Sequence, residues 1–242
     1  MSVGGTDALD EAYLREIRDF VARVASPWHS DHLCFGSVKG KVLHDLLPIA
    51  FTDAVALRVA DRVRRAQDAV GVPLAVENIS YYMHPGKAEM GEAEFIAKVC
   101  DKADCGLMLD VNNAYVNATN FGFDVDEWMR TVPLDRVMQM HIAGHDWFTE
   151  DGTLLGTADA AKESGRADTL IIDTHGADVP DPVMELFKRV VAKTGPLPVV
   201  LERDQDIPPL PVLVAEVERI KKTMAEALAH PKSTADCLLP SP

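Results

Sequence analysis

Short apolar segments alternate with amphipathic helical segments along most of this chain. Apolar segments without polar alternation are typical of strands covered on both faces, as in a parallel sheet flanked by helices. Strands are expected at 31–35, 74–78, 106–110, 137–142, 169–175 and 197–202. Helices are expected at 7–25, 53–70, 92–103, 125–131, 181–194 and 210–228. The alternation therefore predicts an α/β protein with a parallel sheet.

The spacing of the expected strands, roughly 30 residues from one to the next, is that of a βαβ unit. A closed barrel needs eight such units, and six strands are expected in this chain, which begins in the middle of the pattern. We therefore expect a TIM (β/α)8-type barrel that lacks its first one or two strands here. Residues 1–229 should form this single domain, and residues 230–242 a loose tail.

Composition narrows the class of protein. Of the 242 residues, 47% are apolar, which is enough for a core. The formal net charge of −14 argues against nucleic acid or an anionic membrane as partner, because phosphate is bound by clustered Lys and Arg. No apolar run approaches the roughly 20 residues of a membrane span, and the first residues do not resemble a signal peptide. The four cysteines show no disulfide-dense spacing, so a cytoplasmic protein is expected.

Each expected strand ends in, or runs into, side chains that can bind metal ions. The carboxyl ends of parallel strands form the functional face of α/β barrels, so these side chains are expected to meet there. Turn chemistry explains one or two such endings, but His and Glu are not favoured turn residues. The residues are His32; Glu77; Asp110 with Asn112 and Asn113; His141 with His145; Asp173 with His175; and Glu202 with Asp204.

Structural explanations compete with a metal site for several of these residues. The stretch Asp110–Asn113 is also compatible with a simple turn, and His32 with a core histidine whose ring is satisfied. His145 lies past its strand end, where it could contact the substrate or the ligands instead of the metal. Glu77 and Glu202 end apolar strands, where an unpaired carboxylate is costly, so they favour the metal interpretation.

The donor set indicates which metals fit. Its imidazoles and carboxylates exceed what one ion needs, and the surplus suits carboxylates that bridge two or three ions. Mixed nitrogen and oxygen ligands without thiolates suit iron, manganese or zinc. Strand parity points Asp173 and His175 the same way and favours Asn112 over Asn113 beside Asp110. No H-E-x-x-H, EF-hand, G-x-S-x-G, Walker or G-x-G-x-x-G motif occurs, so the prediction rests on the whole set.

At these residues the chain resembles a known family, the multinuclear non-haem iron enzymes typified by MbnB of methanobactin biosynthesis and by TglH. The resemblance covers about residues 4–225. It implies a TIM barrel of the xylose-isomerase type with two or three irons, O2-dependent modification of cysteine in a ribosomally made peptide, and a partner protein that presents the peptide. The shared motifs are Asp31–Phe35, Asp45–Pro48, Glu77–Ser80, Leu109–Asn113, Met140–His145, Ile172–Gly176 and Ile207–Leu210.

The resemblance also implies roles for the strand-end residues. His145 is a candidate proton carrier or substrate contact, and Asp204 a close neighbour of the ligands, so both are candidate catalytic residues. Family members begin with two further strands, the second of which carries a histidine ligand, so one imidazole is expected to be missing here. The implied iron ligands are His32, Glu77, Asp110, Asn113 (or Asn112), His141, Asp173, His175 and Glu202.

Two other functions are compatible with the same residues. A divalent-metal isomerase or phosphodiesterase of the same barrel superfamily would use these donors with manganese or zinc. A non-catalytic, truncated scaffold would bind a partner protein without metal chemistry. Metal content after substitution of His175 and Glu77 distinguishes the scaffold from the enzymes.

Overall fold

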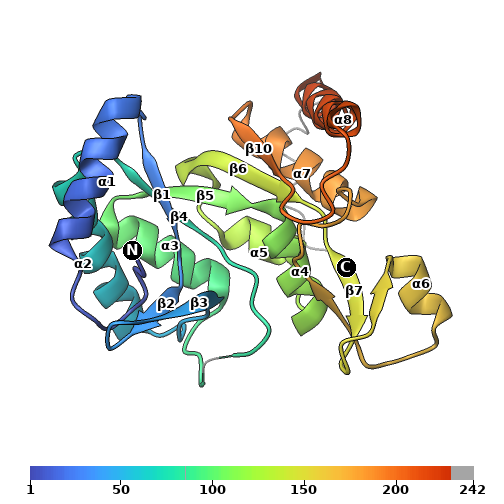
Figure 1. The fold of residues 1–242 in the computed structure, drawn as a ribbon, viewed down its shortest axis with the longest axis horizontal. Coiled ribbons are helices and arrows are strands. Elements are labelled where there is room, and N and C mark those ends of the chain that lie inside the picture. The colour runs from blue at the N-terminus through green and yellow to red at the C-terminus, as the bar shows by residue number, and fades with distance from the viewer. Residues whose placement is uncertain (85, 230–242) are drawn as a thin grey trace, which may run out of the picture.

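A curled sheet of five parallel strands forms the centre of the computed structural model, which describes residues 1–84 and 86–229 (Figure 1). The strands pair in the order β1-β4-β5-β6-β10, and every pairing is parallel. The predicted loose tail lies outside the described residues and stays a prediction. The strands are β1 (His29–His32), β4 (Leu74–Glu77), β5 (Gly106–Asp110), β6 (Val137–Ala143) and β10 (Val199–Glu202).

The helices expected from the sequence are all present, with ends within a few residues of those predicted. Local capping explains where several of them begin and end: Asp10 and Thr52 accept hydrogen bonds from first-turn amides, and Gly71 ends a helix at φ 84°. The helices are α1 (Glu11–Val24), α2 (Asp53–Val70), α3 (Glu92–Ala103), α5 (Val125–Thr131), α7 (Asp181–Thr194) and α8 (Leu210–Ala229).

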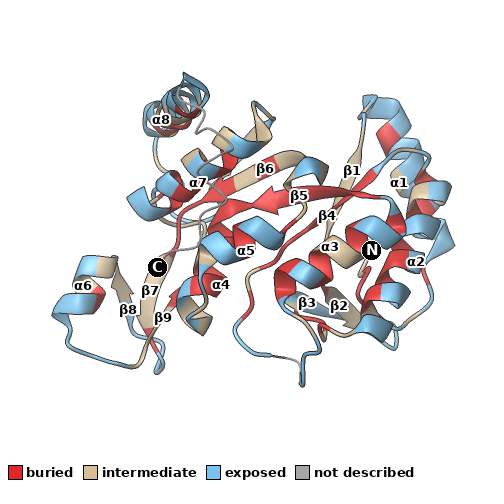
Figure 2. Cartoon of the chain, turned by 180° about the vertical axis from the view of Figure 1, so that it is seen from behind, coloured by how far each residue is buried: buried red, intermediate tan, exposed pale blue. Residues whose placement is uncertain are grey.

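The core lies between the sheet and the helices that cover it. Val59 and Val63 of α2 and Phe95 of α3 are fully buried, as are Val76 and Leu109 of the central strands (Figure 2). Burial on both faces explains why the strands are continuously apolar. Among the described residues, no helix is long and apolar enough to cross a lipid bilayer.

One helix directly behind a strand was not expected. Helix α4 (Val111–Phe121) begins where β5 ends, and Asp110 is its N-cap, its Oδ1 accepting from the amide of Asn113 at 2.7 Å. The sequence of α4 is rich in asparagine and β-branched residues, which have low helix propensity, so its periodicity was not recognised. The predicted turn at Asp110–Asn113 is therefore the first turn of a helix.

Two segments predicted as loops contain strands. Residues 42–51 were expected to be a loop, but β2 (Phe35–Val38) and β3 (Lys41–Leu47) form an antiparallel hairpin there. The side chains of β3 are mostly exposed, so the strand has no apolar pattern to reveal it. The long polar segment 146–167 likewise contains β7 (Asp146–Thr149), β8 (Leu154–Gly156) and a short helix, α6 (Ala158–Glu163).

The prediction of a sixth parallel strand at 169–175 was wrong. Strand β9 (Thr169–Ile172) runs antiparallel to β7, in a separate sheet of order β8-β7-β9, and β10 takes the place beside β6. Between β6 and β9 the chain forms only the six-residue α6, too short for the crossover that a parallel strand requires, whereas antiparallel pairing needs no crossover. We call residues 144–176 the β7–β9 arm; it projects from one end of the sheet (Figure 1).

Candidate metal centre

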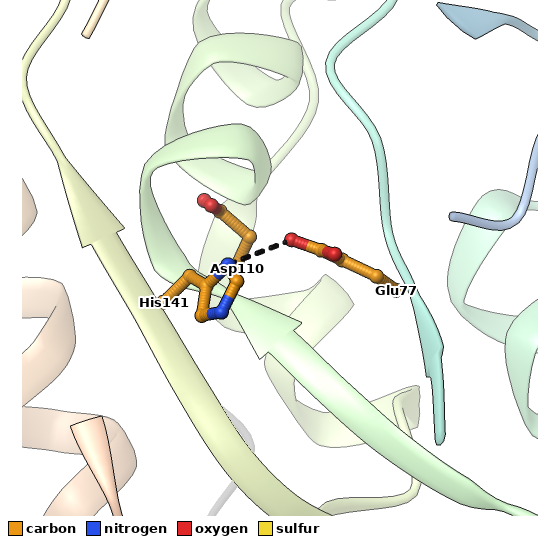
Figure 3. A group of neighbouring side chains, drawn as sticks. All are labelled: Glu77, Asp110 and His141. Carbon is orange, nitrogen blue, oxygen red and sulfur yellow. Dashed lines mark ion pairs between the residues drawn. The ribbon is translucent and has the colours of Figure 1, made fainter. Parts of the chain in front are cut away.

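Three side chains from neighbouring strands meet at the carboxyl end of the sheet. Glu77 ends β4, Asp110 ends β5, and His141 lies on β6 opposite Asp110 in the strand register. Each offers a ligand atom, and these atoms all lie within 4.8 Å of one another (Figure 3). Glu77 and Asp110 are buried, and the side chain of His141 is 12% exposed. We call these residues the strand-end triad.

Two further predicted ligands border the triad. Nδ1 of His141 lies 3.0 Å from Oε1 of Glu77 and 3.0 Å from Oε1 of Glu202, the last residue of β10. Nε2 of His32 lies 3.5 Å from Oε2 of Glu77, because β1 and β4 pair with these two residues side by side. Glu77 therefore lies between two imidazoles, as expected for a carboxylate that bridges metal ions.

Several buried polar atoms at this site lack a hydrogen bond. Buried side-chain nitrogen and oxygen atoms are normally hydrogen-bonded, so each exception needs a reason. Four of the exceptions among the described residues belong to predicted ligands: Oδ2 of Asp110, Oδ1 of Asn113, Nδ1 of His141 and Nε2 of His175. All four are atoms through which such side chains bind metal ions, so the residues fit a metal centre.

The electrostatics of the metal-free site have the same origin. Burial, together with the nearby carboxylates of Asp173 and Glu77, raises the pKa of Asp110 well above its ordinary value. Burial acts against a charge on His141, but the carboxylates of Glu202 and Glu77 outweigh it and raise its pKa to about 10. Without metal, the site therefore holds protons that a cation would displace.

The β7–β9 arm brings a second imidazole to the site. Nε2 of His175 lies 3.0 Å from Oδ1 of Asp173, and Nδ1 lies 3.0 Å from Oδ2 of Asp204 and 3.6 Å from Oε2 of Glu202. Burial lowers the pKa of His175, but Asp173 outweighs it and the pKa rises to about 9. The imidazole thus links the arm to the residues that follow β10.

The parity argument for Asp173 and His175 was wrong, although the two side chains do meet. Strand β9 ends at Ile172, so neither residue lies on a strand. His175 has φ 50°, in the left-handed region that is unusual for a residue with a Cβ, and this backbone turn brings its ring back to Asp173. Such a conformation has no signal in the strand pattern.

The two asparagines after Asp110 have different surroundings. Asn112 is fully buried; its Nδ2 donates to Oδ1 of Asp173 at 2.7 Å, and its Oδ1 lies 2.7 Å from Nδ1 of His145. Asn113 donates from Nδ2 to the carbonyl of Asn78 and keeps Oδ1 without a hydrogen bond. Strand parity favoured Asn112 as ligand, but helix α4 has already begun there, so that argument does not apply.

His145 lies beside the site and not among the strand-end ligands. Its ring stacks on Tyr115 of α4, with centroids 5.4 Å apart and an angle of 12° between the rings. Burial lowers the pKa of His145 to about 4, so the ring is neutral at physiological pH. A neutral, buried imidazole fits the predicted role of substrate contact or proton acceptor.

Four supporting residues were not predicted as part of the site. Asn78 exchanges two hydrogen bonds of 2.9 Å with the backbone of Asp110, and Nε2 of Gln139 lies 3.2 Å from Nε2 of His141. Ser80 and Tyr82 both contact Asp173. Of the four, only Asn78 had a sequence signal, as an amide that directly follows Glu77 at a strand end.

Comparison with known proteins identifies the family. Over residues 1–225 the chain matches the family described as RiPP precursor modification enzyme MbnB/TglH/ChrH. A UPF0276 protein of Anaeromyxobacter sp. (strain Fw109-5) is 39% identical over 229 residues, which cover 95% of this chain and 74% of that protein. A UPF0276 protein of Nitrosospira multiformis is 42% identical over 226 residues, covering 93% of this chain and 73% of the relative.

Solved structures show the fold. A xylose isomerase-like TIM barrel protein from Mycobacterium smegmatis, in complex with magnesium, is similar with a TM-score of 0.52 at 14% identity, over 90% of this chain and 67% of that one. L-ribulose 3-epimerase is similar with a TM-score of 0.51 at 13% identity, over 100% of this chain and 77% of that one. The predicted TIM-type fold is confirmed, as is the resemblance found in the motifs. The protein belongs to the MbnB/TglH/ChrH family of enzymes that modify the precursors of ribosomally synthesised and post-translationally modified peptides (RiPPs).

Proposed function

We propose that this protein is a multinuclear non-haem iron enzyme that oxidatively modifies cysteine in a ribosomally made precursor peptide. Family membership supports the class of substrate. The observation that carries the metal centre is the strand-end triad, whose ligand atoms lie within 4.8 Å of one another. Unpaired buried atoms on Asp110 and His141 add to it, since lone pairs without a hydrogen bond are what a cation would satisfy.

The number and kind of donors support more than one ion. The strand-end triad and Glu202 form one group, and His175 with Asp173 forms a second group that reaches Glu202 from the other side. We propose that Glu202, between His141 and His175, is shared by the two groups. Nitrogen and oxygen donors without thiolate suit iron, with manganese or zinc as alternatives.

Iron bound here would supply activation of O2 and a binding position for the substrate thiolate. The protein's own residues would orient these reactants and move protons. Asp204 contacts Nδ1 of His175 from an exposed position, where it can hold that ring or exchange a proton with solvent. His145 stays neutral beside the site and can accept a proton from the substrate.

The substrate is proposed to be a cysteine-containing peptide presented by a partner protein. The expected partners follow from family resemblance. The net charge of −14 supports a peptide or protein partner over nucleic acid, which would need a basic surface. We further propose a cytoplasmic location, since ribosomal precursors are made there.

A second function, isomerisation or epimerisation of a small carbohydrate with a divalent metal, draws on the fold. The two similar solved structures are a magnesium complex of a xylose isomerase-like barrel and L-ribulose 3-epimerase. The same oxygen-rich donors would serve a single Mn²⁺ or Zn²⁺. We favour the peptide function, because the curated relatives are about 40% identical and these two structures are 13–14% identical.

The test is anaerobic reconstitution with Fe(II), followed by metal analysis and an assay with a cysteine-containing precursor peptide, its partner protein and O2. We expect more than one iron per chain and an O2-dependent change in peptide mass. A matched Asp110→Asn variant should lose both. Uptake of zinc alone, with iron reconstitution failing, would contradict the iron proposal. Partner binding that survives in a metal-free Glu77→Ala, His175→Ala double variant would favour the scaffold.

A further inference from the structure

An amide side chain connects His145 to the arm. Asn112 lies fully buried in the first turn of α4, with Asp173 on one side and His145 on the other. Both contacts are 2.7 Å long, one from Nδ2 to Asp173 and one from Oδ1 to Nδ1 of His145. Asp173 in turn lies 3.0 Å from Nε2 of His175. We call Asn112 and these two contacts the amide bridge.

The chemistry of the amide bridge fixes where a proton lies. An ionised carboxylate only accepts hydrogen bonds, so the NH2 group of Asn112 must face Asp173. The carbonyl oxygen of Asn112 then faces His145, and an oxygen of this kind only accepts. Nδ1 of His145 must therefore carry a hydrogen. In a neutral imidazole this leaves Nε2 as the bare acceptor nitrogen.

The same contacts argue against a ligand role for Asn112. Its oxygen and its nitrogen are both engaged, whereas Oδ1 of the adjacent Asn113 is buried and makes no hydrogen bond. Of the two amides that the sequence left open as ligands, only Asn113 has a free donor atom. Asn112 instead resembles the outer groups that orient metal ligands through hydrogen bonds.

Packing holds His145 in register with the amide bridge. Tyr115 stands one turn after Asn112 on α4 and stacks on the imidazole, with ring centroids 5.4 Å apart. One helix thus fixes both the plane of the ring and the hydrogen bond at Nδ1. No hydrogen bond to Nε2 of His145 occurs among the described side chains, so that nitrogen stays available.

We propose that Asn112 is a positioning residue that holds His145 as the Nδ1–H tautomer, so that Nε2 is the site's proton acceptor, and that Asn113 is the amide ligand. The assignment of an acceptor role rests on the proposed function. The tautomer itself does not, since it follows from the contacts of Asn112 alone.

Nitrogen NMR of the metal-free, full-length protein with ¹⁵N-labelled histidine rings tests the tautomer. A His145→Phe variant, which keeps an aromatic ring against Tyr115, assigns the signals among the eight histidines. We expect a protonated Nδ1 and a bare Nε2 in the unsubstituted protein. In Asn112→Ala the ring should shift toward Nε2–H, whereas Asn112→Asp, which keeps an acceptor oxygen, should preserve Nδ1–H.

Iron binding by the same variants tests the division of labour. Asn113→Ala should weaken iron binding by at least about tenfold, whereas Asn112→Ala should change it by less than that. Asn113→Ala should also leave the tautomer of His145 unchanged. The signals of the other histidines report whether each variant is folded, and Asn112→Ser replaces Asn112→Ala if alanine prevents folding.

The inference is overturned if unsubstituted His145 carries its proton on Nε2, or if the Nδ1–H form persists in Asn112→Ala. Loss of iron in Asn112→Ala equal to that in Asn113→Ala would make Asn112 a ligand and overturn the assignment. If no variant, and not the parent protein, takes up iron while the tautomer shifts as expected, the proposed function fails but the positioning role of Asn112 stands.

Discussion

The strand-end triad and the β7–β9 arm both place an imidazole against carboxylates, but different structures hold them. Glu77, Asp110 and His141 end adjacent parallel strands whose register is fixed by backbone pairing and a buried core. His175 lies beyond an antiparallel strand, at φ 50°, with its amide bonded to the carbonyl of Gly144 at 3.2 Å. The triad is therefore part of the sheet, whereas the position of His175 depends on how the arm docks.

This difference suggests a division between a permanent site and an adjustable one. Donors held by a sheet keep their spacing whether or not metal is present, since moving them would disrupt the core. Donors on a loop-like arm can move with substrate or metal, as loops at functional sites commonly do. We expect the triad to bind the first ion and the arm to complete the position of a second.

The largest effect is expected from breaking the triad. Asp110→Ala removes a buried ligand and also the N-cap of α4, which positions Asn113. Loss of a ligand should exceed the roughly 10–100-fold that outer-shell changes cost in metal affinity, so little iron should remain bound. Titration with Fe(II) under anaerobic conditions measures this. Asp110→Asn keeps more of the cap and serves as the matched control; full iron content in both variants would contradict the role of the triad.

Detaching the arm should have a smaller and more selective effect. A Cβ on Gly144 would lie 2.0 Å from the carbonyl oxygen of Ala177, which is backbone and cannot move aside cheaply. Gly144→Ala should therefore displace His175 and destabilise the protein by about 1–3 kcal/mol, as overpacking does. Metal analysis should show fewer ions per chain than in the parent, but not none. His175→Ala, without the steric clash, should give the same metal content; complete loss of metal in both would refute independent binding by the triad.

The pH dependence of the chelated protein should report the protons held at both regions. The pKa values of His141 and His175 are raised to about 10 and about 9, above the ordinary histidine value of 6.5. The folded state then binds more protons than the unfolded state, so this stability is complete below pH 6.5 and is lost as pH rises toward 10. Denaturant unfolding at several pH values measures it. His141→Gln should flatten the decline more than His175→Gln, and an unchanged slope in both would contradict the assignment.

A buried carboxylate outside the site gives a background to that pH series. Burial raises the pKa of Glu92 to about 8, against the opposing hydrogen bonds from Trp128 and Asn117. Since the folded state holds this proton, stability falls as pH rises from the model value of 4.5 toward 8. Glu92→Gln should be more stable than the parent by about 1 kcal/mol at pH 8.5, and not at pH 5, because an amide carries no charge to bury.

The same contrast explains how much the sequence could predict. The apolar pattern located β4, β5, β6 and β10, and their polar ends gave Glu77, Asp110, His141 and Glu202 by the general rule for parallel sheets. The arm was misassigned because β9 has the composition of a buried strand, and only the absence of a crossover helix distinguishes it. Asp173 and His175 were found, but by an argument about strand parity that does not apply to them.

Contacts that depend on helix rotation could not be predicted. Asn112 and Asn113 are adjacent in sequence, yet one is bonded on both sides and the other has a free oxygen, because α4 begins at Val111. Helix α4 itself has few strong helix formers and is held by its cap and by packing. The support that Gln139 gives to His141 likewise depends on side-chain conformation, which the sequence pattern does not specify.

The most direct test of a multinuclear iron centre is anomalous diffraction at the iron edge from crystals of the anaerobically reconstituted protein. We predict one iron within bonding distance of Glu77, Asp110 and His141, and a second beside His175, with Glu202 between them. An iron position away from these side chains, or a single ion bound only by surface residues, would contradict the account.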